Sequence, residues 1–353
     1  SASHNPSEYN GLKLFSSEGR VIPSDVGARV ERRYRASSAL AAPAIQSGRV
    51  IPSQDSIGPH WNLIRQTVDV ELLRRRRFKV LVDANRGSGS LLARRLLDEL
   101  GCTATILGEV PDGKFEHRPE PTAENLAGVL DQVRQHGCDV GFCQDPDADR
   151  LAVIDEHGRY LGEEYTLAMC VQHVLGQRPG AIVTNCSTSR MTEDLARKFG
   201  VPFFRSAVGE ANVVDAMLAQ GAVLGGEGNG GVIDPRVGLV RDSFVGMAMI
   251  LAAMAARQAS VSQLADELPR YEIVKTKIEL PGDQIPRALE RVARHFADAS
   301  LDRLDGLRFD WPGKWLLVRA SNTEPIVRAI AEAATSAEAD RLCQEAQSAM
   351  LPC

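Results

Sequence analysis

Paired cysteines, long apolar runs and an excess of positive charge are all missing from this sequence. Its seven cysteines are scattered and form no Cys-x-x-Cys pair, which argues against a zinc site or a disulfide framework. The longest apolar run, Val245–Ala256, is too short to cross a bilayer and predicts a buried helix. The net charge of −5 argues against a nucleic-acid or anionic-membrane partner. With no signal-peptide pattern at its start, we expect a reduced, cytoplasmic protein.

Short apolar segments alternate with amphipathic ones along most of the sequence, which is typical of an α/β protein. Phe78–Gly89 predicts a strand that runs into a polar, glycine-rich turn, and a helix follows that ends near Gly101. Ala181–Ser189 repeats this plan, and its helix ends at Gly200. Each unit is followed by two strands joined by an acidic loop. We interpret the two units as copies of one α/β unit.

The predicted fold is therefore a series of repeated α/β domains, with mixed sheets sandwiched by helices, and a smaller C-terminal α+β domain. We expect these domains at residues 1–47, 48–157, 158–268 and 269–353. The last one departs from the repeat, because strand-like segments such as Tyr271–Leu280 alternate there with helical ones in another order.

Gly141–Asp155 (GFCQDPDADRLAVID) places three carboxylates at alternate positions between two apolar segments. In an extended chain, Asp145, Asp147 and Asp149 would project from one face. Three close carboxylates repel one another unless a cation neutralises them, and oxygen ligands favour Mg²⁺ over Zn²⁺. The alternative is a solvated acidic turn, which flanking buried strands would make costly.

Two further stretches lie nearer the ends of the chain. Near the start, the Asn5-Pro6 turn would present the hydroxyl of Ser3, and Lys13 is placed to reach back as a charged partner. Near the end, Arg319–Arg328 (RASNTEPIVR) collects guanidinium, hydroxyl and amide groups in a tight turn that we expect to precede a helix. Such a turn suits a bound anion, and it equally suits a helix N-cap.

A fourth stretch, Gly225–Gly231, surrounds the single carboxylate of Glu227 with glycines. Glycines let a backbone approach a ligand closely, and an ordinary hairpin loop is the alternative.

In this order, the four stretches resemble the α-D-phosphohexomutases, which include phosphoglucomutase/phosphomannomutase and phosphoglucosamine mutase. The family's serine loop (Thr-Ala-Ser-His-Asn-Pro), metal loop (Asp-Gly-Asp-Gly-Asp-Arg) and phosphate loop (Arg-x-Ser-Gly/Asn-Thr-Glu-Pro) are matched by SASHNP, DPDADR and RASNTEP. Its sugar loop, Gly-Glu-x-Ser-Gly-His, is matched in part by GEGNGG, with Asn229 for Ser and Gly231 for His. The family's first domain begins well upstream of the serine loop, so the resemblance implies an N-terminally truncated first domain in residues 1–47.

The resemblance implies an isomerase that interconverts hexose 1-phosphate and hexose 6-phosphate, with glucose or mannose as the sugar. A phosphoserine at Ser3 would exchange its phosphoryl group with the substrate, and a hexose 1,6-bisphosphate would be the intermediate and activator. The implied catalytic residues are Ser3, His4, Lys13 and Arg150, and the implied Mg²⁺ ligands are Asp145, Asp147, Asp149 and a phosphate oxygen on Ser3.

The resemblance also implies how a small-molecule sugar phosphate, the expected partner, would be held. The implied substrate-binding residues are Glu227 and Asn229 for the sugar, and Arg319, Ser321, Asn322, Thr323 and Arg328 for the non-reacting phosphate. A monomer or homodimer is expected. Phosphoglucosamine mutase activity, a non-catalytic sugar-phosphate-binding relative, a phosphatase with an Asp nucleophile and a purely structural protein are the alternatives.

Overall fold

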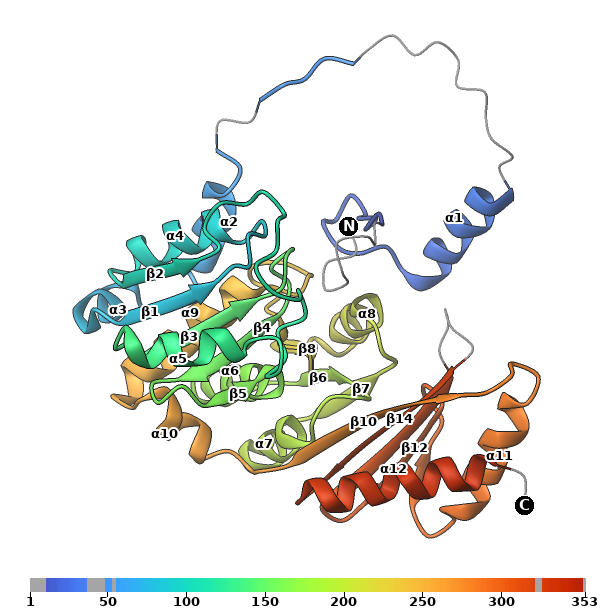
Figure 1. Ribbon diagram of the computed structural model, residues 1–353. Coiled ribbons are helices and arrows are strands. Elements are labelled where there is room, and N and C mark those ends of the chain that lie inside the picture. The colour runs from blue at the N-terminus through green and yellow to red at the C-terminus, as the bar shows by residue number, and fades with distance from the viewer. Residues whose placement is uncertain (1–10, 37–47, 53–54, 321–325, 352–353) are drawn as a thin grey trace.

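The structure is a computed structural model that describes residues 11–36, 48–52, 55–320 and 326–351 (Figure 1). The first described segment contains an isolated bridge between Phe15 and Val21 and helix α1 (Ser24–Ala36), none of whose residues is buried. An ion pair between Arg20 and Asp215 joins this segment to the body of the protein. Among the described residues, no helix has the length and apolar character needed to cross a membrane.

The first α/β unit contains a five-stranded mixed sheet in the order β2-β1-β3-β4-β5. Its strands are β1 (Lys79–Asp83), β2 (Thr103–Leu107), β3 (Val140–Gln144), β4 (Leu151–Asp155) and β5 (Tyr160–Gly162). Strand β1 runs parallel to β2 and β3, and β4 runs antiparallel to its neighbours. The helices of this unit are α2 (Gly58–Ile64), α3 (Val70–Arg76), α4 (Ser90–Glu99) and α5 (Ala127–Gln135).

The second α/β unit repeats this plan in the order β7-β6-β8-β9. Its elements are β6 (Ile182–Asn185), α7 (Met191–Phe199), β7 (Phe203–Ser206), α8 (Glu210–Gln220), β8 (Leu224–Glu227) and β9 (Gly231–Ile233). Here β6 runs parallel to β7 and β8, and β9 runs antiparallel to β8. The order and directions match those of β2, β1, β3 and β4, so the predicted repetition of an α/β domain is confirmed.

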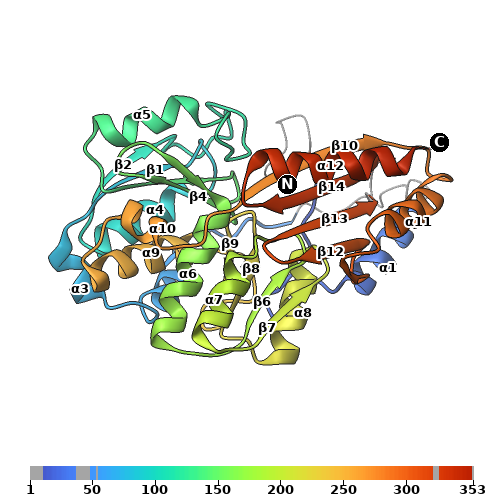
Figure 2. The same cartoon turned by 90° about the horizontal axis from the view of Figure 1, so that it is seen from below.

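Helices α6 (Glu163–Gln177) and α9 (Ser243–Arg257) pack against each other, and α10 (Val261–Asp266) packs against both. Every residue of α9 from Ser243 to Ala255 is buried, as its apolar sequence predicts. One hydrophobic core runs from the first unit through α6 and α9 into the second. The two units are therefore joined by shared packing. Figure 2 shows how their elements are arranged.

The C-terminal unit contains an antiparallel sheet in the order β10-β14-β13-β12-β11 with its own hydrophobic core. Its elements are β10 (Glu272–Glu279), α11 (Ile285–His295), β11 (Ser300–Asp302), β12 (Leu307–Trp311), β13 (Lys314–Ala320), β14 (Ile326–Ala333) and α12 (Ser336–Met350). The prediction of a helix directly after the RASNTEP stretch is wrong, because strand β14 follows there. Val327, Ala329 and Ala331 alternate onto the buried face of β14, so the segment has the period of a strand.

A partly buried pair, His117 and the buried Asp83, predicts a pH-dependent contribution to stability. His117 Nε2 lies 2.7 Å from Asp83 Oδ2. Burial lowers the pKa of His117, but the hydrogen bond and charge of Asp83 outweigh it and raise the pKa above its ordinary 6.5. The stabilisation is therefore complete below about pH 6.5 and is lost as the pH rises through the higher folded-state pKa.

We expect His117→Gln to reduce this fall in the free energy of unfolding, measured by chemical denaturation between about pH 5 and pH 9. The matched control is His136→Gln, because His136 is exposed. An unchanged pH dependence in the His117 variant would contradict the assignment.

Candidate functional site

The acidic loop after β3 is a turn. Ala148 adopts a left-handed backbone conformation with φ 59°, and its N–H donates to the Asp145 carbonyl at 2.9 Å. The backbone N–H groups of Asp149 and Arg150 both donate to Asp145 Oδ1, at 3.1 and 3.0 Å. The predicted extended geometry is therefore wrong, although the three carboxylates do converge.

The carboxylates of Asp145, Asp147 and Asp149 each place an oxygen within 4.8 Å of the others. Burial, together with the charges of Asp149 and Asp147, raises the pKa of Asp145 well above its ordinary range. Asp149 Oδ1 is buried and accepts no hydrogen bond from the described residues. Crowded carboxylates with a buried free acceptor suit a hard divalent cation, so this donor set fits Mg²⁺.

Lys13 and Arg150 are the sequence-predicted cations that the structure places at this loop. Lys13 Nζ lies 3.1 Å from Asp147 Oδ2 and 2.7 Å from Asp149 Oδ2. Burial lowers the pKa of Lys13, but Asp149 and Asp147 outweigh it and raise that pKa, which keeps the ammonium charged. The mostly buried Arg150 has its Nε 3.9 Å from Asp145 Oδ2. The predicted residues Ser3 and His4 lie outside the described residues.

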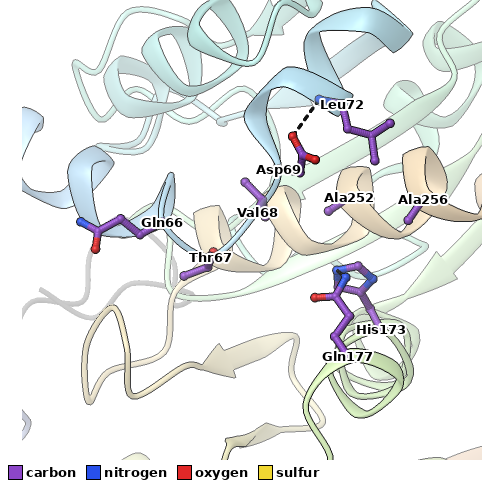
Figure 3. Close-up of a pocket in the computed structure, with 9 residues that line it drawn as sticks. All are labelled: Gln66, Thr67, Val68, Asp69, Leu72, His173, Gln177, Ala252 and Ala256. Carbon is purple, nitrogen blue, oxygen red and sulfur yellow. Dashed lines mark hydrogen bonds between the residues drawn. The ribbon is translucent and has the colours of Figure 1, made fainter.

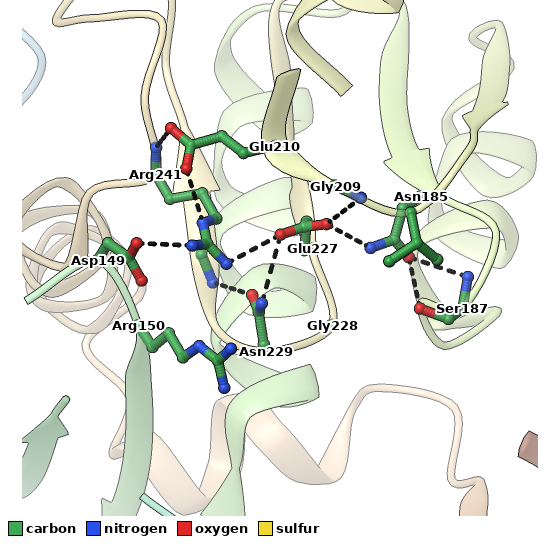
Figure 4. Close-up of polar contacts among 12 residues, drawn as sticks. Asp149, Arg150, Asn185, Ser187, Gly209, Glu210, Glu227, Gly228, Asn229 and Arg241 are labelled. Carbon is green, nitrogen blue, oxygen red and sulfur yellow. Dashed lines mark hydrogen bonds and ion pairs between the residues drawn. The ribbon is translucent and has the colours of Figure 1, made fainter. Parts of the chain in front are cut away.

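Glu227 ends β8 and is buried among four donors (Figure 4). Its Oε1 accepts hydrogen bonds from Asn185 Nδ2 at 2.7 Å and the Gly209 N–H at 3.1 Å. Its Oε2 accepts from Arg241 Nη1 at 2.9 Å and from the predicted Asn229, through Nδ2, at 3.3 Å. Burial raises the pKa of Glu227, but the Arg241 charge and these hydrogen bonds outweigh it and lower that pKa. Glu227 is therefore an ionised acceptor.

Arg241 and Asn185 are site residues that the sequence analysis missed. Asn185 occupies the place in the second unit that Asn85 has in the first, so the repeat itself carried a signal for it. Arg241 belongs to no recognised motif. Besides Glu227, its guanidinium contacts Glu210 Oε2 through Nε at 3.2 Å and Asp149 Oδ2 through Nη2 at 2.6 Å. Arg241 therefore links the metal-type loop, which contains Asp145, Asp147 and Asp149, to the sugar-type loop, which contains Glu227 and Asn229.

The RASNTEP stretch connects β13 to β14, where Arg319 and Arg328 face each other in register. Lys277 of β10 is opposite Arg328 on its other side, so three cations follow one another across the sheet. Asp305 Oδ1 accepts a hydrogen bond from Arg319 Nε at 3.2 Å, and Asp305 Oδ2 accepts the Val208 N–H at 2.9 Å. Like charges on opposed positions destabilise a sheet, and a bound anion would relieve that repulsion. Ser321, Asn322 and Thr323 lie outside the described residues.

A separate cavity of about 280 Å³ lies between the segment before α3 and helices α6 and α9 (Figure 3). Asp69, His173, Gln177 and Ala252 are among its lining residues. It shares no residue with the loops described above, so it is distinct from the candidate site.

Four family models match the chain in order. Phosphoglucomutase/phosphomannomutase alpha/beta/alpha domains I, II and III match residues 1–41, 59–158 and 163–271, and the C-terminal domain matches residues 276–348.

Curated relatives cover nearly the whole chain. A phosphoglucomutase/phosphomannomutase of Thermococcus kodakarensis is 38% identical over 343 residues, which are 96% of this chain and 75% of that protein. A protein of Thermococcus gammatolerans named "Probable phosphoglucosamine mutase" is 33% identical over 351 residues, 98% of this chain and 77% of that protein.

Solved structures share the fold. A phosphoglucomutase/phosphomannomutase family protein from Burkholderia thailandensis matches with a TM-score of 0.69 and 28% identity, over 82% of this chain and 64% of that one. A Paramecium phosphoglucomutase, parafusin, matches with a TM-score of 0.75 and 16% identity, over 99% and 76%. The chain therefore belongs to the phosphoglucomutase/phosphomannomutase family, the α-D-phosphohexomutases, which are isomerases that act as intramolecular phosphotransferases.

Proposed function

We propose that this protein interconverts the 1-phosphate and 6-phosphate of glucose or mannose. The observation that carries the proposal is the direct connection of the acidic triad to Glu227 through Arg241, which holds a metal-type loop and a sugar-type loop in one site. The relative at 38% identity carries both sugar names, which supports glucose and mannose as substrates. The aligned cations of the C-terminal sheet fit a substrate that carries phosphate.

In this proposal, Asp145, Asp147 and Asp149 hold Mg²⁺ together with a phosphate oxygen on Ser3. Bound Mg²⁺ would neutralise negative charge on the oxygens of the transferring phosphoryl group. Lys13 adds a fixed positive charge beside the same carboxylates.

The proposed chemistry moves one phosphoryl group at a time. The P–O bond to Ser3 Oγ breaks as a free hydroxyl of the hexose monophosphate attacks, which gives a hexose 1,6-bisphosphate. The intermediate then turns over and returns its other phosphoryl group to Ser3, which leaves the isomeric monophosphate. Arg150 stabilises the phosphate at the metal loop, and His4 is the candidate for a proton transfer there.

The non-reacting phosphate is assigned to the C-terminal loop. Arg319 and Arg328 lie opposite each other, so one phosphate could contact both guanidinium groups. The proposed ligands of this phosphate are Arg319, Ser321, Asn322, Thr323 and Arg328. Because this grip is remote from the reacting phosphate, it can hold either end of the sugar while the other end reacts.

Glu227 and Asn229 are the proposed sugar contacts. Glu227 already accepts four hydrogen bonds within the chain, so a sugar hydroxyl has to replace one of these donors. Asn229 makes the longest of the four, at 3.3 Å, and is the donor most easily replaced. A released Asn229 amide would then be available to a neighbouring hydroxyl.

The broader assignments follow the same proposal. We place domains at residues 1–47, 48–157, 158–268 and 269–353, and we propose a cytoplasmic monomer or homodimer.

Phosphoglucosamine mutase activity is the second candidate. Several relatives at 30–33% identity are named "Probable phosphoglucosamine mutase". The ionised Glu227 is an anion that suits the 2-ammonium group of glucosamine phosphate.

We expect relaxed selectivity, with kcat/KM for glucose 1-phosphate and mannose 1-phosphate within about a hundredfold of each other. Gly231 offers no side chain to the sugar, and Glu227 already has donors within the chain. Exchanging glucose for its epimer mannose therefore leaves few buried polar groups unpaired. Phosphorus NMR with Mg²⁺ and catalytic glucose 1,6-bisphosphate would measure both rates.

Ser3→Ala is the matched inactive control for these assays. A preference for glucosamine phosphate of several orders of magnitude would transfer the proposal to the second candidate. Release of inorganic phosphate without isomerisation would instead indicate a phosphatase.

A further inference from the structure

The space beside Gly231 is filled by the side chain of Arg241. A Cβ atom placed on Gly231 would lie 2.3 Å from Arg241 Cδ and 2.7 Å from Arg241 Cγ, which is closer than real Cβ contacts allow. Glycine at position 231 is therefore required by the close approach of Arg241. The glycine and the arginine, ten positions apart, form one packing unit.

The guanidinium of Arg241 is fixed by three carboxylates from three separate parts of the chain: a helix, a strand and a loop (Figure 4). Nε contacts Glu210 at the start of α8, Nη1 contacts Glu227 at the end of β8, and Nη2 contacts the metal-loop residue Asp149. The Arg241 side chain is 11% exposed, and those of its partners are 9% exposed or less. A planar fork with three charged acceptors has little rotational freedom, so the distance between Glu227 and Asp149 is set by one rigid group.

We propose that Arg241 is the positioning residue that holds the sugar-loop carboxylate Glu227 in register with the metal-loop carboxylate Asp149, and that Gly231 is required to admit it. This inference rests on the proposed function and deepens it, because it names the side chain that takes up the space beside the sugar loop. Lysine would not reproduce the arrangement, because one ammonium lacks the planar fork that reaches three carboxylates.

Loss of Arg241 should affect both the binding of the sugar and the rate of transfer. The buried carboxylate of Glu227 would lose the guanidinium that neutralises it and would reorient. Its hydrogen bonds to the hexose would then weaken, which raises KM. The sugar would also shift relative to the reacting phosphate, and a displacement of about 1 Å can cost about a hundredfold in rate. A purely structural role would lower stability without changing KM.

The test compares Arg241→Gln, Arg241→Lys, Gly231→Ala and the double variant Gly231→Ala/Arg241→Gln by steady-state kinetics. Arg241→Gln should lower kcat/KM by about a hundredfold with a raised KM, and Arg241→Lys should recover part of the loss. Gly231→Ala keeps every charge but displaces the guanidinium, and we expect a loss of about tenfold or more. The double variant should lose no more than Arg241→Gln alone, because both changes disable the same contact.

Arg236→Gln is the matched control, because Arg236 precedes α9 on the same segment, contacts Asp234 and makes none of the contacts described for Arg241. Thermal melting reports whether each variant is folded, and if Arg241→Gln does not fold, Gly231→Ala decides the question. Arg241→Gln within about threefold of the control, or fully additive losses in the double variant, would overturn the inference.

Calorimetric binding of glucose 6-phosphate separates failure of this inference from failure of the proposed function. If the wild-type protein binds the sugar phosphate without turning it over, the proposed function fails. Weaker binding in Arg241→Gln and Gly231→Ala than in Arg236→Gln then still supports the role of Arg241, and equal binding overturns it.

Discussion

Asp147→Ala should reduce kcat by about a thousandfold while the protein stays folded. Asp147 shares the acidic loop with Asp145 and Asp149, and its charge contributes to the raised pKa of Asp145. Removing one of three mutually repelling carboxylates relieves strain in the metal-free protein. The Asp147 side chain is 25% exposed, so its loss leaves no buried cavity. The activity should therefore fall, while the free energy of unfolding of the metal-free protein rises or stays the same.

Melting temperature with and without Mg²⁺ tests this expectation without relying on turnover. Wild-type protein should gain thermal stability in the presence of Mg²⁺ by mass action, and Asp147→Ala should gain much less. Asp112→Ala is the matched control, because the Asp112 side chain is 28% exposed and is also paired with a cation, Arg86. If Asp147→Ala keeps full Mg²⁺-dependent turnover, the acidic loop has another role.

The features that could be predicted from the sequence are those with local or strictly ordered signals. The two α/β units were visible because strand, Asn, small turn and helix recur in the same order. The structure places the four strands of the second unit in the same order as the first four of the first unit, β2-β1-β3-β4 and β7-β6-β8-β9. The buried helix α9 was predictable from an uninterrupted apolar run. The meeting of Asp145, Asp147 and Asp149 was predicted, but for the wrong reason: they converge because Ala148 turns the chain.

Other features depend on packing between distant segments. Ile326–Ala333 forms a strand because it pairs with both β10 and β13, and the sequence after a proline does not reveal those partners. Arg241 carries no motif, and its importance follows from three carboxylates that the fold brings together from positions 149, 210 and 227. The need for glycine at 231 likewise becomes visible only when Arg241 is seen beside it.

Lys13→Met should lower kcat by about a hundredfold or more and should at the same time strengthen Mg²⁺ binding. Lys13 Nζ lies 3.1 Å from Asp147 Oδ2 and 2.7 Å from Asp149 Oδ2, so it neutralises oxygens that Mg²⁺ would also use. Without the ammonium, the three carboxylates retain more negative charge and attract a divalent cation more strongly. The transferring phosphoryl group loses a fixed positive charge, and this lowers the rate.

The opposite signs of these two effects separate Lys13 from a simple structural residue. Calorimetric titration with Mg²⁺ should give a Kd that is lower by at least several-fold for Lys13→Met, because the Coulomb energy of two charges about 4 Å apart is about 1 kcal/mol in bulk water and about 4 kcal/mol near a protein surface. Lys114→Met is the matched control, because Lys114 is exposed and lies 3.9 Å from the carboxylate of Asp112. Weaker Mg²⁺ binding in Lys13→Met would mean that the lysine organises the loop for the metal. Unchanged turnover in Lys13→Met would remove Lys13 from the catalytic residues, whatever the Mg²⁺ affinity of the variant. The ammonium would then act only on the carboxylates of the metal-free protein.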